Sequence, residues 1–212
     1  MSPENPRAAL VREAIRLHQR YQEELIERYS ICPWAKPSRS DGHVRTHVVI
    51  DVPCSLDDLA EVVDGWAANE AAEVAFVITP RFESGSAAFD QWAEEVGALR
   101  SDIFLSAPFH PSPPEPVGIV RFLRQTPDPT VQLVRRSRLE EIRSQDPPHY
   151  TDIFDLNVRD LEASKAPRTI AASVLAHNDR LIDREGRAAL QAIIDDIKRD
   201  RERTYTRIFP SL

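Results

Sequence analysis

The chain has 212 residues, a formal net charge of -7 and an isoelectric point near 5.4. Its hydrophobic fraction of 42% and charged fraction of 29% are ordinary for a globular domain that buries a core without disulfides or a structural metal. An acidic chain lacks the basic face that a general nucleic-acid binder uses to displace counterions, so we expect no nucleic-acid partner.

The sequence also contains no run of about 18 apolar residues of the kind that crosses a bilayer. Its first residues, MSPENPRAALVREAIR, lack the apolar core of a signal peptide. We therefore expect a soluble protein of the reducing cytoplasm without a membrane partner. Cys32 and Cys54 are then expected to be free thiols rather than a structural disulfide. Oligomeric state is left open by the sequence.

Apolar residues at helical spacing predict a long amphipathic helix over residues 6–29. Strand-like stretches are predicted at 43–52, 72–80 and 102–111, with helices at 55–71 and 86–100 between them. This alternation predicts an α/β fold: a mainly parallel sheet of about four strands with helices on its faces. The fourth strand is TVQLVRR at 130–136, at the sheet edge or antiparallel.

Two more helical patterns follow, at 166–181 and 184–206, and the second carries a clean apolar stripe. We therefore predict an α/β core domain over residues 1–146 and a helical C-terminal extension over 147–212, packed on that core. A proline-rich stretch over 108–129 predicts a long loop, which is either an ordinary surface excursion or a segment that closes over a substrate.

The sequence SICPWAK, at residues 30–36, places Cys32 where the first helix must stop. If Pro33 is the first residue of a new helical turn, Cys32 is its N-cap, and the free backbone N–H groups there favour a thiolate. Lys36, one turn on, would add to this effect. The alternative is a cysteine that simply packs beneath the helix end, and the usual burial of cysteine favours it. Cys54, before the cap of the next helix, is interpreted as structural.

His110 closes a buried strand beside the long loop, and ligands of open parallel sheets bind at that edge. A histidine there serves as a general base or a metal ligand, or is an ordinary loop histidine. His18 falls beside the apolar stripe of the first helix and is expected to be a packed, satisfied side chain. The sequence contains no Gly-rich phosphate loop, HExxH, paired CxxC or GxSxG motif, so no cofactor is named by a motif.

Five short motifs occur in one order: ICPWAK, GHVRTHVV, EVAFVITP, APFHP and PDPTVQLVRR. In this order, over about residues 15–145, the chain resembles the bacterial domain-of-unknown-function 1415 family. The resemblance implies functional roles for Cys32 and His110 but supplies no reaction. It also matches Arg45, Glu73 and Arg135 to positions of the family pattern.

The chain departs from that pattern around the last of these motifs, in the stretch RFLRQTPDPTVQLVRR. Arg121 and Arg124 stand where the family has asparagines, Gln132 where it has a strand histidine, and Arg136 where it has a glutamate. These changes make any pocket there more positive and suggest a more anionic substrate. Glu73 opens its strand and His110 closes a parallel one, so the two are not expected to share a site.

Three hypotheses follow. The first is a thiol-dependent hydrolase or transferase that acts on a small anionic metabolite, with Cys32 as nucleophile, His110 as general base or acid, and Lys36, Arg124 and Arg135 as substrate contacts. The second is a metal- or haem-binding protein that uses the same Cys and His as ligands. The third is a non-enzymatic interaction module that docks through RRSR at 135–138 and the charged C-terminal helix, although such charge runs are usually solvated faces.

Overall fold

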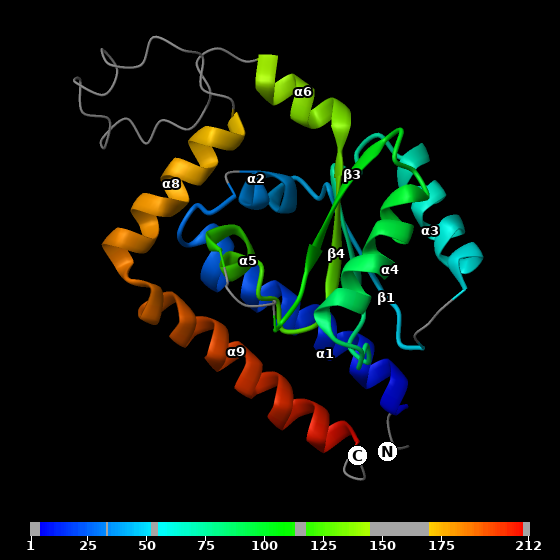
Figure 1. The fold of residues 1–212 in the computed structure, drawn as a ribbon. Helices are drawn as coiled ribbons and strands as arrows, with labels where there is room; N and C mark the ends of the chain where they lie inside the picture. Colours follow the sequence, from blue (N-terminus) through cyan, green and yellow to red (C-terminus); the bar gives the residue numbers. More distant parts are fainter. Residues whose placement is uncertain (1–4, 33, 52–54, 113–117, 145–169, 210–212) are drawn as a thin grey trace, which may run out of the picture.

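A computed structural model describes residues 5–32, 34–51, 55–112, 118–144 and 170–209 (Figure 1). Pro33, Cys54 and the whole of the predicted extension before residue 170 lie outside the described residues. The N-terminal half holds α1 (Pro6–Tyr21), the π-helix η1 (Gln22–Glu27), α2 (Ala35–Ser40), β1 (Val44–Val48), α3 (Leu56–Ala68), β2 (Val74–Ile78) and α4 (Ser86–Ala98). The C-terminal half holds β3 (Phe104–Phe109), α5 (Ile119–Leu123), β4 (Thr130–Arg135), α6 (Arg136–Ser144), α8 (Ile170–Glu185) and α9 (Arg187–Ile208).

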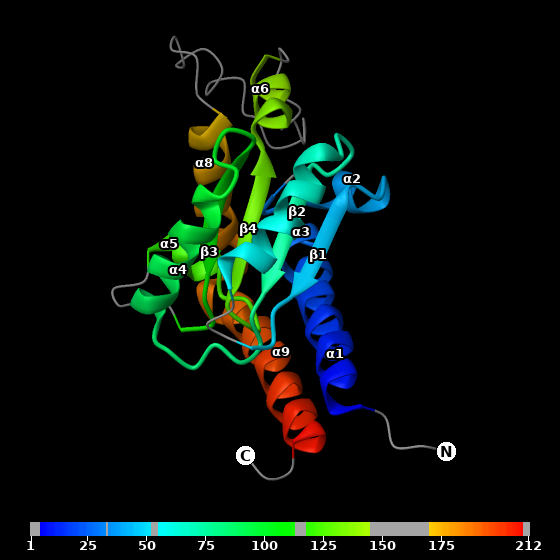
Figure 2. The ribbon, with the colours of Figure 1, turned by 90° about the vertical axis from the view of Figure 1, so that its right-hand side faces the viewer.

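The sheet is mixed, so the α/β class is confirmed but a mainly parallel sheet is not. Its strand order is β1-β2-β4-β3, and only β1 and β2 form a parallel pair (Figure 2). The fourth strand is antiparallel to both of its neighbours and separates β2 from β3. It lies in the sheet interior rather than at an edge, and Val131 and Leu133 on it are almost completely buried.

The two faces of the sheet carry different partners (Figure 1). Ala75 and Val77 of β2 point into a core formed with α3 and α4, whereas Val74, Phe76 and Ile78 point toward α1. The approach of α4 to β3 is close enough to require glycine, because a Cβ at Gly97 would lie 2.2 Å from Ser106 Oγ. The strands therefore alternate between an α3/α4 face and an α1 face.

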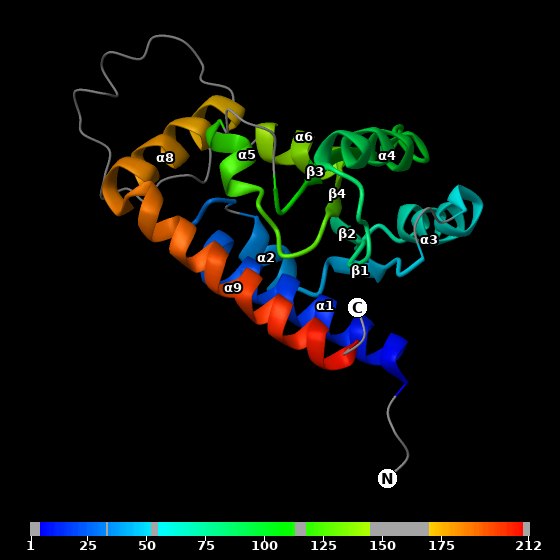
Figure 3. The ribbon, with the colours of Figure 1, turned by 60° about the horizontal axis from the view of Figure 1, so that its bottom comes forward.

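The two C-terminal helices were predicted at 166–181 and 184–206, and α8 and α9 match these patterns within a few residues. Helix α9 runs antiparallel beside α1 (Figure 3), where Asp200 accepts hydrogen bonds from Arg16 (2.9 Å) and Arg20 (2.7 Å). Leu190 of α9 belongs to the same buried cluster as Leu17 of α1. The predicted domain boundary at residues 146 and 147 lies outside the described residues and stays a prediction.

A buried ionic contact ties α9 to the start of β4. Asp128 is 1% exposed and accepts hydrogen bonds from Arg201 Nε at 2.6 Å and from the Tyr205 hydroxyl at 2.7 Å. Thr79, after β2, donates through both its backbone N–H and its hydroxyl to the carbonyl of Pro129. The chain that leads into β4 is therefore fixed to both a strand and a C-terminal helix.

Candidate functional site

The first helix stops at Ser30, before the proline. Ser30 has a left-handed backbone with φ of 52°. The N–H of Ile31 donates to the carbonyl of Ile26 at 2.9 Å, and the N–H of Ser30 donates to that of Glu27 at 3.2 Å. These two bonds and the left-handed residue form a Schellman motif, a position that glycine normally occupies. This turn positions Cys32 beside the C-terminal end of the helix.

The helix also changes its pitch before that stop. Residues Gln22–Glu27 form a π-helix, which the sequence pattern did not reveal. Such segments are uncommon and are often found at functional sites. Gln22, Ile26 and Glu27 of this segment line the cavity described below.

Cys32 is partly buried, and its surroundings oppose ionisation. Burial raises the pKa of the thiol, although hydrogen bonds from the backbone N–H groups of Trp34 and Ala35 to the sulfur partly offset that rise. The predicted lowering of the pKa is therefore not found. The predicted N-cap position is also wrong, because Trp34 is the N-cap of the six-residue helix α2. Lys36 is exposed and does not contribute to the environment of the thiol.

A cavity of about 620 Å³ lies on the α1 face of the sheet. Phe76 of β2 and Gln132 of β4 belong to its sheet side, and its other walls come from α1, η1, α2, α5, α6 and α8. These helices gather on one side of the sheet (Figure 1). Cys32 and Arg124 both line this cavity, so the structure brings two of the predicted site residues together.

Arg124 is the distinctive charge of the cavity. Its guanidinium lies 5.2 Å from the centre of the Phe109 ring, a cation–π contact, and no carboxylate among the described residues pairs with it. Burial lowers the pKa of the guanidinium. The other charged residues of the lining are paired: Glu27 with Arg39 at 2.6 Å, and Arg138 with Glu141 at 2.6 Å. Among the described cavity residues, one positive charge is therefore left without a counter-charge.

Among the described residues, three side chains of the cavity have a buried polar atom without a hydrogen-bond partner: His18, Asn178 and Arg138, whose Nε lies 3.4 Å from Glu73 Oε1 without forming a hydrogen bond. His18 is 5% exposed, and its Nδ1 has no hydrogen-bond partner, whereas its Nε2 lies 3.4 Å from Gln22 Nε2. Asn178 is 6% exposed, and its Oδ1 is likewise unpaired. Unpaired buried polar atoms are rare and call for an explanation such as a missing ligand or water. The expectation that His18 is packed is confirmed, but it is not a fully satisfied side chain.

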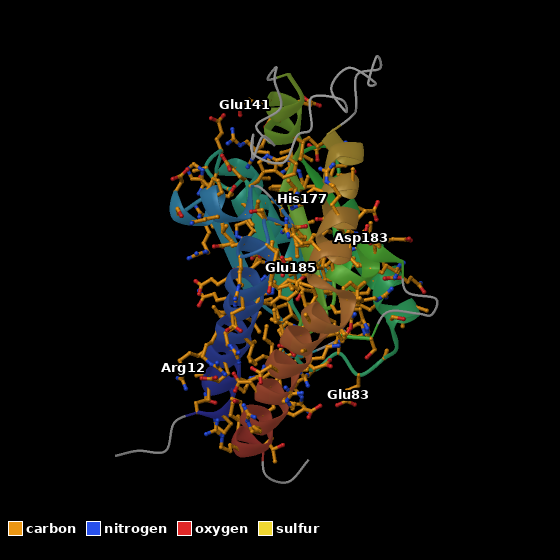
Figure 4. The ribbon with its side chains drawn as sticks, turned by 90° about the vertical axis from the view of Figure 1, so that its left-hand side faces the viewer. Arg12, Glu83, Glu141, His177, Asp183 and Glu185 are labelled. Carbon is orange, nitrogen blue, oxygen red and sulfur yellow. The ribbon has the colours of Figure 1, made fainter. Side chains whose placement is uncertain are left out.

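Asn178 is positioned by α8, the helix seen with its labelled side chains in Figure 4. His177, its neighbour, lies with Nε2 3.3 Å from the carbonyl of Tyr29 and so connects α8 to the end of the first helical segment (Figure 4). Sequence reasoning missed Asn178, because an asparagine within a helical pattern gives no sign of which tertiary surface it faces.

His110 lies apart from the cavity. Its Nδ1 accepts a hydrogen bond from the N–H of Ser112 at 3.1 Å, and its ring packs 5.7 Å from the ring of Phe89 in α4. Phe109 lines the cavity, and side chains alternate along an extended chain, so His110 is directed to the α4 side. The structure does not bring His110 to Cys32, and the predicted dyad is not supported.

Arg135 is occupied by a structural role. Its guanidinium donates to the carbonyls of Ala72, Trp66, Ala67 and Asn69, which caps the C-terminal end of α3. The other arginines of RRSR are also engaged, since Arg136 donates to the carbonyl of Ser101 and Arg138 pairs with Glu141. Arg135 does not line the cavity, so the structure gives no support to its predicted contact with an anionic substrate, and docking through RRSR stays a prediction.

Glu73 forms a small polar cluster at the start of β2. It accepts a hydrogen bond from Ser38 at 2.8 Å and pairs with His43 at 3.1 Å and Arg138 at 3.4 Å. Glu73 does not pair with Arg45, which donates instead to the backbone carbonyls of Gly42 and Val44.

Within the described ranges, no three or more His, Cys, Asp or Glu side chains are grouped so as to hold a metal ion. No helix in the same ranges is both long and apolar enough to cross a membrane.

Comparisons with known proteins assign no relative: no family model, no curated protein and no solved structure matches the chain. The resemblance to the domain-of-unknown-function 1415 family stays a prediction. The cavity itself therefore provides the evidence for a function.

The charge of Arg124 should cost the folded protein stability. We expect Arg124→Met to raise the unfolding free energy by about 1 kcal/mol, because a similar-sized apolar side chain removes an unpaired, desolvated charge. Chemical denaturation at neutral pH measures this difference. The matched control is Arg121→Met, three residues earlier, which removes an exposed ion pair with Asp90 and should lower stability by at most about 1 kcal/mol. A larger loss for Arg124→Met than for Arg121→Met would contradict this account.

The burial of His18 predicts a pH dependence. Desolvation lowers its pKa to about 3 from an ordinary 6.5, so the folded state holds it neutral while the unfolded state takes up a proton. The contribution of neutral His18 to the unfolding free energy is complete above about pH 6.5. It is lost as the pH falls toward 3, by at most about 1.4 kcal/mol per pH unit. We expect the unfolding free energy of His18→Gln to decline less steeply than wild type between pH 6 and pH 4. His177→Gln, at a partly buried histidine, is the control, and equal slopes for wild type and His18→Gln would refute the assignment.

Proposed function

We propose that the chain binds a small organic monoanion with an apolar body in the cavity on the α1 face of the sheet. The observation that carries this proposal is the unpaired guanidinium of Arg124 in a largely apolar lining. An arginine is kept in such a place at a cost to stability, and that cost is recovered when an anion binds.

The chemistry of the lining favours a carboxylate as the anionic group. Guanidinium presents a planar edge that pairs with two carboxylate oxygens at once, and its packing on the Phe109 ring restricts its orientation. A volume of about 620 Å³ is within the usual range of small-molecule pockets, about 300–1,000 Å³. With the other charged lining residues paired, one negative charge on the ligand balances the cavity.

A thiol-dependent reaction is the second candidate, because Cys32 lines the same cavity as Arg124. Hydrolysis or acyl transfer with His110 as general base is not supported, since His110 is directed to the α4 side. Any chemistry at Cys32 has to proceed without that histidine.

Isothermal titration calorimetry with acids and their neutral amides tests the proposed binding. Benzoate, phenylacetate and hexanoate are compared with benzamide, phenylacetamide and hexanamide, and the proteins are wild type, Arg124→Met, Arg124→Lys and Arg121→Met. We expect the acids to bind more tightly than the amides, and Arg124→Met to lose at least about tenfold in affinity for the acids, as the loss of a charge-assisted hydrogen bond implies. Arg124→Lys should recover part of the loss, and Arg121→Met should match wild type.

The contradictory result is equally clear. If none of the acids binds better than its amide, or if Arg124→Met binds the acids as well as Arg121→Met does, Arg124 is not the anion contact and the proposal fails.

A further inference from the structure

We propose that Cys32 forms a reversible covalent adduct with a ligand that carries both a carboxylate and an aldehyde or ketone, while Arg124 holds the carboxylate. This inference rests on the proposed function, because it names the substrate class of the same cavity. It goes beyond binding by assigning a chemical step to the thiol.

Cys32 and Arg124 are both placed around Tyr21. Cys32 and Arg124 come from different segments of the chain, yet both line the cavity, and Cys32 packs against the buried cluster that contains Tyr21 and Leu123. The Tyr21 hydroxyl donates to the carbonyl of Leu123, the residue before Arg124. Tyr21 therefore fixes the end of α5, with Arg124, close to the segment that holds the thiol.

The protonation state of the Cys32 thiol also favours this reaction. Burial raises the pKa of the Cys32 thiol and so keeps it protonated at neutral pH, while the backbone N–H groups of Trp34 and Ala35 act in the opposite direction and lower that pKa. These N–H groups stabilise negative charge on the sulfur as its proton leaves, without producing a free thiolate beforehand. A thiol of this kind suits a reaction in which it supplies both its sulfur and its proton.

The described residues of the cavity include no free base that would accept the thiol proton at neutral pH. Glu27 is paired with Arg39, and burial holds the pKa of His18 at about 3, so neither is a ready proton acceptor at neutral pH. Acyl transfer needs a group that takes the thiol proton and delivers it to a leaving group. Addition to a carbonyl needs no group that keeps this proton and no leaving group, because the proton passes from the sulfur to the new hydroxyl and all atoms stay in the adduct.

The step is balanced without a further reactant. The sulfur of Cys32 forms a bond to the carbonyl carbon, the carbon–oxygen π bond breaks, and the thiol proton ends on the new hydroxyl oxygen. Nothing is oxidised or reduced. The new hydroxyl is a hydrogen-bond donor, and Asn178 Oδ1 in the same cavity is a buried acceptor without a partner. A neutral His18 with an unpaired Nδ1 adds a second uncharged polar group suited to this product.

The experiment uses 4-carboxybenzaldehyde labelled with carbon-13 at its aldehyde carbon. The protein carries Cys54→Ser, so that Cys32 is its single thiol. We expect the labelled resonance to move from the aldehyde to the hemithioacetal region on mixing, and to stay unchanged with Cys32→Ala or Cys32→Ser in the same background. Thermal unfolding verifies that each variant is folded. If Cys32→Ala does not fold, Cys32→Ser alone tests whether the adduct forms at Cys32.

Arg124 is tested in the same assay. We expect Arg124→Met to weaken adduct formation with 4-carboxybenzaldehyde on the order of tenfold, and Arg121→Met to leave it unchanged. Labelled benzaldehyde, which lacks the carboxylate, should form little adduct and should not respond to Arg124→Met. Equal adduct formation by both aldehydes in wild type would overturn the role given to Arg124.

The outcomes separate this inference from the proposed function. If benzoate binds in an Arg124-dependent manner and no adduct forms, covalent capture is overturned and anion binding stands. If benzoate does not bind and no adduct forms, both fail. An adduct that persists in Cys32→Ser would place the chemistry at another residue and overturn the inference.

Discussion

The insertion of β4 between β2 and β3 is the constraint on which the rest of the structure depends. Its start is fixed by the buried contacts of Asp128 with Arg201 and Tyr205, and by the bonds from Thr79 to Pro129. Its middle places Gln132 in the lining of the cavity. Helix α5, with Arg124 directly after it, precedes this strand and α6 follows it. One central antiparallel strand therefore sets both the α1 face of the sheet and two walls of the cavity.

Local departures from regular, fully paired structure gather around that cavity. The π-helix Gln22–Glu27, the left-handed Ser30, the unpaired charge of Arg124 and the unpaired atoms of His18 and Asn178 all lie along or beside it. Each one costs folding free energy, and such costs collect at functional sites because the surrounding fold can support them. The opposite face of the sheet, covered by α3 and α4, is a mainly apolar core, and its unpaired buried atoms among the described residues are Trp92 Nε1 and Asp90 Oδ1 of α4.

The sequence indicated individual elements better than their arrangement. The spacing of apolar residues was sufficient for the first helix and for the strands at β2 and β3, because period and burial leave direct marks on residue type. The antiparallel, central position of β4 left no such mark: TVQLVR reads equally well at an edge. The assumption of a mainly parallel sheet then led to the wrong site prediction. The rule that ligands bind at the carboxyl ends of parallel strands pointed to His110.

The candidate site was predictable only where local sequence settles the geometry. The sequence predicts that the first helix ends just before Cys32, so the position of Cys32 at that helix end could be anticipated. The residue that ends the helix is Ser30 rather than Pro33. Arg124 follows α5 and Arg135 ends β4, and only tertiary contacts distinguish the unpaired cavity charge of the first arginine from the helix-capping role of the second. Burial of the Cys32 thiol is also tertiary, which is why its pKa is raised rather than lowered.

A crystal structure of the protein with 4-bromobenzoate would test the central claim most directly, because the bromine locates the ligand independently by anomalous scattering. The account predicts that the carboxylate oxygens lie within hydrogen-bond distance of the Arg124 guanidinium, with the bromophenyl ring against the apolar lining. A ligand bound elsewhere, or a cavity left without it while Arg124 pairs with a carboxylate of the protein, would contradict the account.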